Sequence, residues 1–127
     1  MRESGAGYRK LAVWGRSHQL TLEIYRASKT FPPEERFALT SQMRRAASSV
    51  PMNLAEGATG ASVGSYALAV DHALRSAGEV EYQLLLAHDL GYLSRDAYTR
   101  LETEVQLIRR MLAKLYRTLK RVRAEAS

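Results

Sequence analysis

The amino-acid sequence predicts an all-α fold, an antiparallel up-down-up-down four-helix bundle with a kinked second helix. Four long segments carry apolar residues at spacings of three and four, as helices with one buried side do. The sequence has no sustained period-two alternation and no Asn-Gly or Asp-Gly hairpin turn, so strands are not predicted. The connections between the segments are short, which favours antiparallel neighbours in a bundle.

A single domain is expected because 127 residues, 46% of them hydrophobic and 25% charged, suffice for one core. We assign the bundle to residues 11–123 and predict a mobile N-terminal tail over residues 1–10. The first helix is expected over about residues 11–30, because Pro32 and Pro33 cannot continue it.

The second helix, expected over about residues 33–56, has a proline in its middle. Its predicted apolar stripe consists of Phe37, Thr40, Met43, Ala47, Val50 and Leu54. Pro51 lacks an N–H and its ring crowds the carbonyl four residues earlier, which costs roughly 3 kcal/mol in a helix interior. We predict a kink at Pro51, with Ser48 and Ser49 helping to satisfy the freed backbone groups.

Glycines and serines delimit the third and fourth helices. Gly57 and Gly60 are expected to end the second helix, and Ser62 to cap a third that runs to about residue 90. Gly91 then ends the third helix and Ser94 caps the fourth. Eight apolar positions alternate steps of three and four there, typical of a helix packed in a bundle: Tyr98, Leu101, Val105, Ile108, Leu112, Leu115, Leu119 and Val122.

Composition excludes several classes of protein. Without cysteine, the chain can form neither a disulfide framework nor a thiolate metal site. No apolar run approaches 20 residues, so no membrane span is predicted. The first ten residues lack the apolar core of a signal peptide, and a cytoplasmic location is therefore expected.

Patterns that support catalysis are also missing, and we predict no catalytic residue, no metal and no cofactor. A di-iron bundle needs Glu-x-x-His, but the residues three before His18, His72 and His88 are glycine, alanine and leucine. Residues 60–64 match the pattern G-x-S-x-G, yet a nucleophile elbow requires a strand before it. A helix is predicted before this segment, so we interpret Ser62 as a helix cap.

The net charge of +6 belongs to one end of the chain. Residues 1–106 carry 12 Lys and Arg against 12 Asp and Glu, so the excess lies in residues 107–127. The cations there are Arg109, Arg110, Lys114, Arg117, Lys120, Arg121 and Arg123. They indicate either a solvated face or a surface that binds the phosphates of RNA or DNA. Only Tyr116 lies among them, so contact with the nucleic-acid backbone is expected without base stacking.

Two polar lines flank the apolar stripes of the middle helices. The residues are Gln42, Arg45, Ser49, Asn53 and Glu56 on the second helix, and Ser76, Glu79 and Gln83 on the third. Small and polar side chains of this kind suit a second packing surface, between helices or between subunits. We expect Arg45 to form an ion pair with Glu79 or Glu56.

Residues at about 10–120 also carry a combination of positions typical of one family. These positions are Gln42, Arg45, Ala46, Ser49, Pro51, Asn53, Ala55, Glu56 and Gly57 on the second helix, and Ser76, Glu79 and Glu81 on the third. With them the chain resembles the bacterial four-helix bundle proteins encoded by intervening sequences of large-subunit ribosomal RNA genes, also called ribosomal-protein-like intervening-sequence proteins. Arg75 replaces the usual glycine, and Gly78 is atypical as well.

The resemblance implies an antiparallel bundle that assembles into a ring, a homopentamer, with no established enzymatic activity. It also implies a distant similarity to the accessory proteins of diversity-generating retroelements, which are basic pentameric bundles that act with reverse transcriptase and nucleic acid. An RNA-binding role is an inference, because the family's link to ribosomal RNA is largely one of gene location.

Three hypotheses for the function follow. The first is a non-catalytic oligomeric protein that binds the backbone of RNA or DNA through its basic C-terminal helix. The alternative is a structural or adaptor protein that binds a protein partner without nucleic acid. An enzyme site at a subunit junction, built from Arg45, Glu56 and Glu79, is the least favoured, because no nucleophile–base pair or set of metal ligands is visible.

Overall fold

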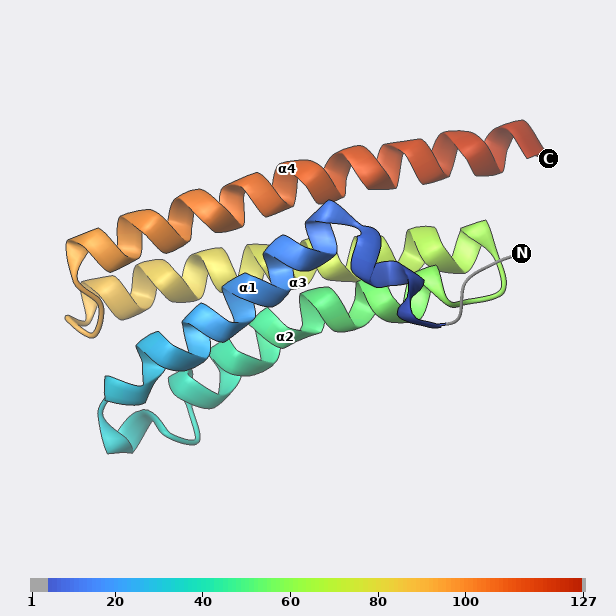
Figure 1. Cartoon of the computed structure of the whole chain (residues 1–127). Coiled ribbons are helices and arrows are strands. Elements are labelled where there is room, and N and C mark those ends of the chain that lie inside the picture. The colour runs from blue at the N-terminus through green and yellow to red at the C-terminus, as the bar shows by residue number, and fades with distance from the viewer. Residues whose placement is uncertain (1–4, 127) are drawn as a thin grey trace.

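The computed structural model describes residues 5–126, with side chains from residue 7, and contains four long helices (Figure 1). The helices are α1 (Ala12–Ala27), α2 (Leu39–Ala58), α3 (Val63–Asp89) and α4 (Arg95–Ala126), with 3₁₀ turns η1 (Gly5–Lys10), η2 (Ser28–Thr30) and η3 (Pro33–Glu35). No strand occurs within this described range. The predicted all-α class is therefore confirmed.

The helices pack as an antiparallel bundle in which α1 contacts α2, α2 contacts α3, α3 contacts α4, and α4 contacts α1. Two hydrogen bonds show the direction of the first pair, because Thr21 lies beside Ala47 whereas Tyr25, further along α1, lies beside Arg44, earlier in α2. The helices differ in length. With 32 residues α4 spans about 48 Å, whereas α1 with 16 residues spans about 24 Å.

The core follows the predicted stripe closely on α4. On α4, the most completely buried side chains are Leu101, Val105, Ile108 and Leu112, each no more than 1% exposed. Val122, at the end of the predicted stripe, is 40% exposed. The predicted caps are present, since the backbone N–H of Ser65 donates to Ser62 Oγ at 3.0 Å and the N–H of Ala97 donates to Ser94 Oγ at 3.1 Å.

The second helix begins later than predicted. Pro33–Glu35 form a separate 3₁₀ turn, and Ala38 has the non-helical dihedrals φ −121° and ψ −106°, so α2 starts at Leu39. Phe37 therefore stands before the helix and is 86% exposed, so its assignment to the apolar stripe was wrong. The two prolines and the chain reversal, not the apolar pattern, determine the direction of Phe37.

Gly57 lies inside the last turn of α2 and not at its end, contrary to the prediction. It is buried, and a Cβ added there would lie 2.8 Å from Ala69 Cβ and 2.9 Å from Tyr66 Cδ1. Such contacts are too short for a side chain, so the absence of one lets α2 and α3 approach closely. Only glycine fits this helix crossing without displacing α3.

Only part of the predicted N-terminal tail, residues 5–10, lies within the described residues. Residues 1–4 of the predicted tail lie outside the described residues. Gly5–Lys10 form η1, which contacts both α1 and α2. The ring of Tyr8 packs edge-on against Trp14, with 5.1 Å between the ring centroids. The mobility assigned to residues 1–10 stays a prediction, but the second half of this segment has a packed position.

The α2 helix continues through Pro51, which is buried. Pro51 leaves the carbonyl of Ala47 without its usual backbone donor. The Thr21 hydroxyl of α1 lies 3.1 Å from that oxygen and 2.8 Å from Ser17 O, in a buried position. The kink itself stays a prediction, but a side chain from the neighbouring helix compensates for the proline.

The two serines predicted to assist Pro51 have other partners. Ser48 Oγ donates to Arg45 O at 3.2 Å, and Ser49 Oγ forms a hydrogen bond with Ser76 Oγ at 2.7 Å. Neither hydroxyl contacts the Ala47 carbonyl among the hydrogen bonds of the described residues. This prediction was wrong because the nearest hydroxyl in space comes from α1.

Replacement of Thr21 by valine should destabilise the fold by about 1–3 kcal/mol, because it removes the hydroxyl hydrogen that the buried Ala47 carbonyl shares with the Ser17 carbonyl. The change is nearly isosteric, so urea unfolding reports mainly the lost hydrogen bond. Thr21→Ser retains the hydroxyl and is the matched control. In a Pro51→Ala background the N–H at position 51 returns, and Thr21→Val should then cost less. An equal cost in both backgrounds would contradict this assignment.

Candidate functional site

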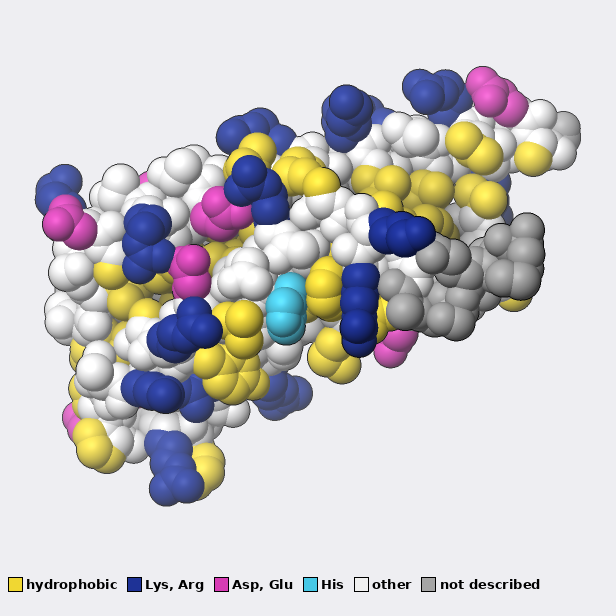
Figure 2. Space-filling model, in the orientation of Figure 1, with side chains coloured by type: hydrophobic (Ala, Val, Ile, Leu, Met, Phe, Trp, Pro, Cys, Tyr) yellow, Lys and Arg dark blue, Asp and Glu magenta, His cyan; other side chains and the backbone are white. Residues whose placement is uncertain are grey.

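The basic C-terminal helix presents a line of cations on the side opposite its core. Arg110, Lys114, Arg117 and Arg121 are all exposed and follow one another at steps of four, three and four. Figure 2 shows Lys and Arg side chains in dark blue along the edge of the molecule formed by α4. We name these four residues the α4 cation line. Its geometry follows from the same periodicity that places Leu112 and Leu119 in the core.

Arg109 is turned toward α3 instead. Its guanidinium forms an ion pair with Glu81, and Gln106 Nε2 donates to the other carboxylate oxygen of Glu81 at 3.1 Å. The hydrogen bond from Gln106, supported by Arg109, holds the pKa of Glu81 below its ordinary value, although partial burial acts in the opposite direction. The charge of Arg109 is therefore engaged in joining α3 to α4.

The other two predicted cations also have neighbours. Lys120 Nζ lies 5.9 Å from the centre of the Tyr116 ring. The guanidinium of Arg123 covers the start of α3, since a Cβ added to Gly64 would lie 3.1 Å from Arg123 Cζ. The structure thus brings four of the seven predicted residues into one outward line and places Arg109 and Arg123 against α3.

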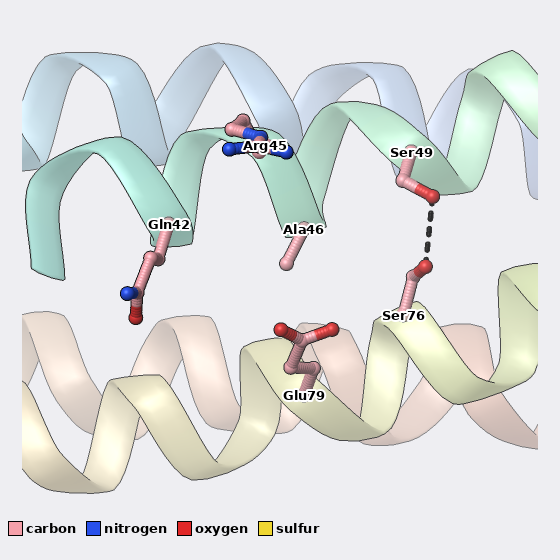
Figure 3. Close-up of a pocket in the computed structure, with 6 residues that line it drawn as sticks. All are labelled: Gln42, Arg45, Ala46, Ser49, Ser76 and Glu79. Carbon is pink, nitrogen blue, oxygen red and sulfur yellow. Dashed lines mark hydrogen bonds between the residues drawn. The ribbon is translucent and has the colours of Figure 1, made fainter. Parts of the chain in front are cut away.

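A polar groove of about 570 Å³ runs between α2 and α3. It is lined by Gln42, Arg45, Ala46, Ser49, Ser76 and Glu79 (Figure 3). At one end, Asn53 Nδ2 donates to Ser49 O at 2.8 Å and to Ser49 Oγ at 3.0 Å, and Ser49 Oγ bonds Ser76 Oγ. The two predicted polar lines therefore face each other across one groove.

The ion pair predicted for Arg45 is absent. Among the described side chains, Arg45 forms no ion pair with Glu79 or Glu56, and Glu56 does not line the groove. Figure 3 shows the Glu79 carboxylate directed toward α2, whereas Arg45 lies over the ribbon of α2. The charges in this groove are thus opposite in sign but separate.

Gln83 is the most buried of the predicted polar residues on α2 and α3. It is 5% exposed, and its Oε1 atom has no hydrogen-bond partner in the described structure. The Ser49–Ser76 contact sets the antiparallel register of α2 and α3. Two helical turns further along, this register places Gln42 opposite Gln83. The orphan acceptor therefore lies beyond Glu79, at the Gln42 end of the groove.

A second group of cations was missed by the sequence reasoning. Lys29, Arg36 and Arg44 line a depression at the turn between α1 and α2. The charge balance hides them, because acidic residues elsewhere in residues 1–106 cancel their charge in the sum. A local count over residues 25–45 would have revealed this group, since this segment holds five Lys and Arg against two Glu.

Within residues 5–126 no three His, Asp or Glu side chains converge to hold a metal. None of the helices described is long and apolar enough to cross a membrane. Candidate binding sites include the α4 cation line, the groove between α2 and α3, and the depression at the turn.

Residues 9–114 match the family described as 23S rRNA-intervening sequence protein. The chain belongs to this family. The match ends at residue 114, so Arg117, Lys120, Arg121 and Arg123 lie beyond it. The family match therefore does not include the most basic part of α4.

A solved structure supports the fold independently. It is a protein of unknown function from the S23 ribosomal protein family of Bacteroides thetaiotaomicron, 24% identical, with a TM-score of 0.76 over 83% of this chain and 95% of that one. At that identity the likeness establishes the shared fold alone. No curated protein is significantly similar to the chain.

Replacement of Glu81 by glutamine should lower stability at pH 7 by under about 1 kcal/mol, because the pair with Arg109 is partly exposed. The folded-state pKa of Glu81 is lowered, so its stabilisation is present above the unfolded pKa of about 4.3 and is lost as pH falls through the folded value. Urea unfolding of variant and parent should therefore converge below about pH 4.

Glu125→Gln, an exposed change near the end of α4, is the control and should leave the unfolding free energy nearly unchanged at either pH. A difference between Glu81→Gln and the parent that stays constant from pH 7 to pH 3 would contradict the role given to the Glu81 carboxylate.

Proposed function

We propose that this protein is a cytoplasmic, non-catalytic, oligomeric bundle that binds the phosphate backbone of RNA or DNA through the α4 cation line. The observation that carries the proposal is the outward row of four exposed cations in a segment, residues 105–124, that contains no acidic residue. Ordinary solvated helices mix Lys and Arg with Glu, which partner them at four-residue spacing. In this row only Arg121 has an acid at that spacing, Glu125.

The dimensions of the row suit a polyanion. Arg110 and Arg121 are eleven positions apart, so the row spans about 16 Å along the helix. Double-stranded nucleic acid carries one charge per about 1.7 Å of axis, so the row reaches several phosphates. Each neutralised phosphate releases condensed counterions, which supplies affinity that depends on salt and little on base sequence.

The family description gives the first ligand to test. The family description names the intervening sequences of 23S rRNA, so we choose structured RNA as a test ligand beside duplex DNA. The proposal does not rest on this description, since Arg117 and Arg121, half of the α4 cation line, lie outside the matched residues.

Neutralising two members of the row, with Lys114→Gln and Arg117→Gln together, should weaken binding to duplex RNA and DNA alike. The plot of log affinity against log salt should become shallower by about two units, because two phosphate contacts are lost. Fluorescence anisotropy at a series of salt concentrations measures both quantities. Arg75→Gln with Arg95→Gln removes two exposed cations elsewhere and is the matched control. If the parent has no affinity even at low salt, the proposal is wrong.

Assembly into a homo-oligomer is the second part of the proposal, and the resemblance implies a ring of five copies. The groove between α2 and α3 supports it, because Arg45 and Glu79 are both exposed there and have no ion-pair partner among the described residues. A second subunit placed over the groove would supply such partners.

Light scattering at micromolar concentration should therefore report a stable oligomer. Glu79→Lys places a second positive charge in the groove beside Arg45 and should shift the protein toward the monomer. Glu125→Lys makes the same change of charge at the exposed end of α4 and should leave the mass unchanged. A monomeric parent protein would remove this part of the proposal.

One observation favours the alternative of an adaptor that binds a protein partner. The outer side of α3 exposes Leu68 by 59%, Tyr82 by 62% and Leu85 by 41%, more apolar surface than a solvated helix requires. A partner held there should resist nuclease and high salt, whereas a ligand of the α4 cation line should not. Capture in the presence of nuclease at high salt discriminates between the two functions.

A further inference from the structure

The turn between α1 and α2 combines positive charge with exposed aromatic rings. We name it the turn patch and define it by Tyr25, Lys29, Arg36, Phe37 and Arg44. Lys29, Arg36 and Arg44 line a depression of about 310 Å³ whose floor includes Phe31 and the two prolines. Figure 2 shows Lys and Arg beside hydrophobic side chains at this end of the molecule, away from the C-terminal half of α4.

An arginine guanidinium lies over each of the two aromatic rings of the patch, Phe37 and Tyr25. Arg36 Cζ lies 5.2 Å from the centre of the Phe37 ring, and Arg44 Cζ lies 4.8 Å from that of Tyr25. Phe37 is 86% exposed and Tyr25 43%, so both rings are accessible from solvent. Phe37 precedes α2 and is almost absent from the core, so the fold gives no reason for a phenylalanine at this position.

The patch keeps an excess of positive charge. The acids of the turn are Glu34, which is exposed, and Glu35, whose carboxylate oxygens accept hydrogen bonds from Tyr92 Oη at 2.8 Å and from Leu39 N at 3.3 Å. Residues 25–45 as a whole hold five Lys and Arg against these two Glu, so the local field is positive and favours an anionic ligand.

The patch is also held in a defined shape. Arg44 Nε donates to Ser28 Oγ at 2.9 Å and Arg44 Nη2 donates to Tyr25 O at 3.1 Å, which ties α2 to the end of α1. Phe31 is buried and packs on Tyr92, with 5.4 Å between ring centroids. Because these contacts order the turn beforehand, a ligand would not have to pay for ordering it.

We propose that the turn patch binds a single-stranded segment of RNA or DNA, with bases stacked on Phe37 and Tyr25 and phosphates beside Lys29, Arg36 and Arg44. Aromatic platforms interleaved with cations are the means by which proteins hold single strands, because every base offers a stacking face. In a duplex the bases are already stacked on one another and cannot reach these rings. The depression is at the small end of the range for ligand pockets, about 300–1,000 Å³, which suits one nucleotide at a time.

This inference shares its class of ligand with the proposed function but uses another surface. The α4 cation line offers charge without aromatic platforms and serves duplex and single strand alike. The turn patch adds selectivity for unpaired bases. The protein would then hold a duplex and an adjoining single strand at opposite ends of one bundle.

Fluorescence anisotropy of the full chain with a 5′-labelled twelve-residue single-stranded RNA, and with the same strand in a duplex, tests the inference. Phe37→Ala should weaken single-strand binding roughly tenfold, the effect of losing one stacked base, and leave duplex binding unchanged. Arg36→Gln should weaken single-strand binding and reduce its salt dependence by about one unit. Because Phe37 is so exposed, its removal should not disturb the fold, which thermal unfolding checks.

Met52→Ala removes an exposed apolar residue from α2, Arg75→Gln removes an exposed cation from α3, and both should leave the two affinities unchanged. Equal single-strand affinities of Phe37→Ala and the parent would overturn the inference, as would a change of oligomeric mass in Phe37→Ala, which would make the patch a subunit contact. Duplex binding that persists in that case leaves the proposed function standing. Conversely, single-strand binding that depends on Phe37 without any duplex binding would support the turn patch and reject the role of α4.

Discussion

The continuity of α2 through Pro51 is the constraint on which the rest of the bundle depends. This helix packs against α1 on one side and α3 on the other, so a break at its midpoint would displace both neighbours. The proline leaves the Ala47 carbonyl without its backbone donor, and the Thr21 hydroxyl occupies the required position. The hydroxyl of Thr21 in α1 thereby supplies a hydrogen bond that the backbone of α2 cannot make for itself.

Close approach of α2 and α3 follows from small residues at their crossing. Gly57 meets Ala69 and Tyr66 where no side chain fits, and Ser49 meets Ser76 further along. The same closeness confines the polar groove and leaves Gln83 buried without a donor for its carbonyl oxygen. The groove thus lies between two helices that pack through small residues.

Tertiary contacts also sort the cations by role. Arg109 forms an ion pair with Glu81, and the guanidinium of Arg123 lies beside Gly64. The side chains of the α4 cation line are exposed to solvent. At the other end of the molecule, Arg36 and Arg44 lie over aromatic rings. The fold therefore presents two basic surfaces of different chemistry, a row of charges on α4 and a set of aromatic rings with charges at the turn between α1 and α2.

Local patterns in the sequence determined the four helices, the caps Ser62 and Ser94, and the membership of the core along α4, because helical periodicity and capping act within a few residues. They also identified the polar lines and the basic end of α4. Only the tertiary structure decided that Thr21 serves Pro51, that Arg109 belongs to Glu81 and that Phe37 points to solvent. These outcomes depend on partners more than 20 residues away, or on a chain reversal, and such distances leave no periodic signal in the sequence.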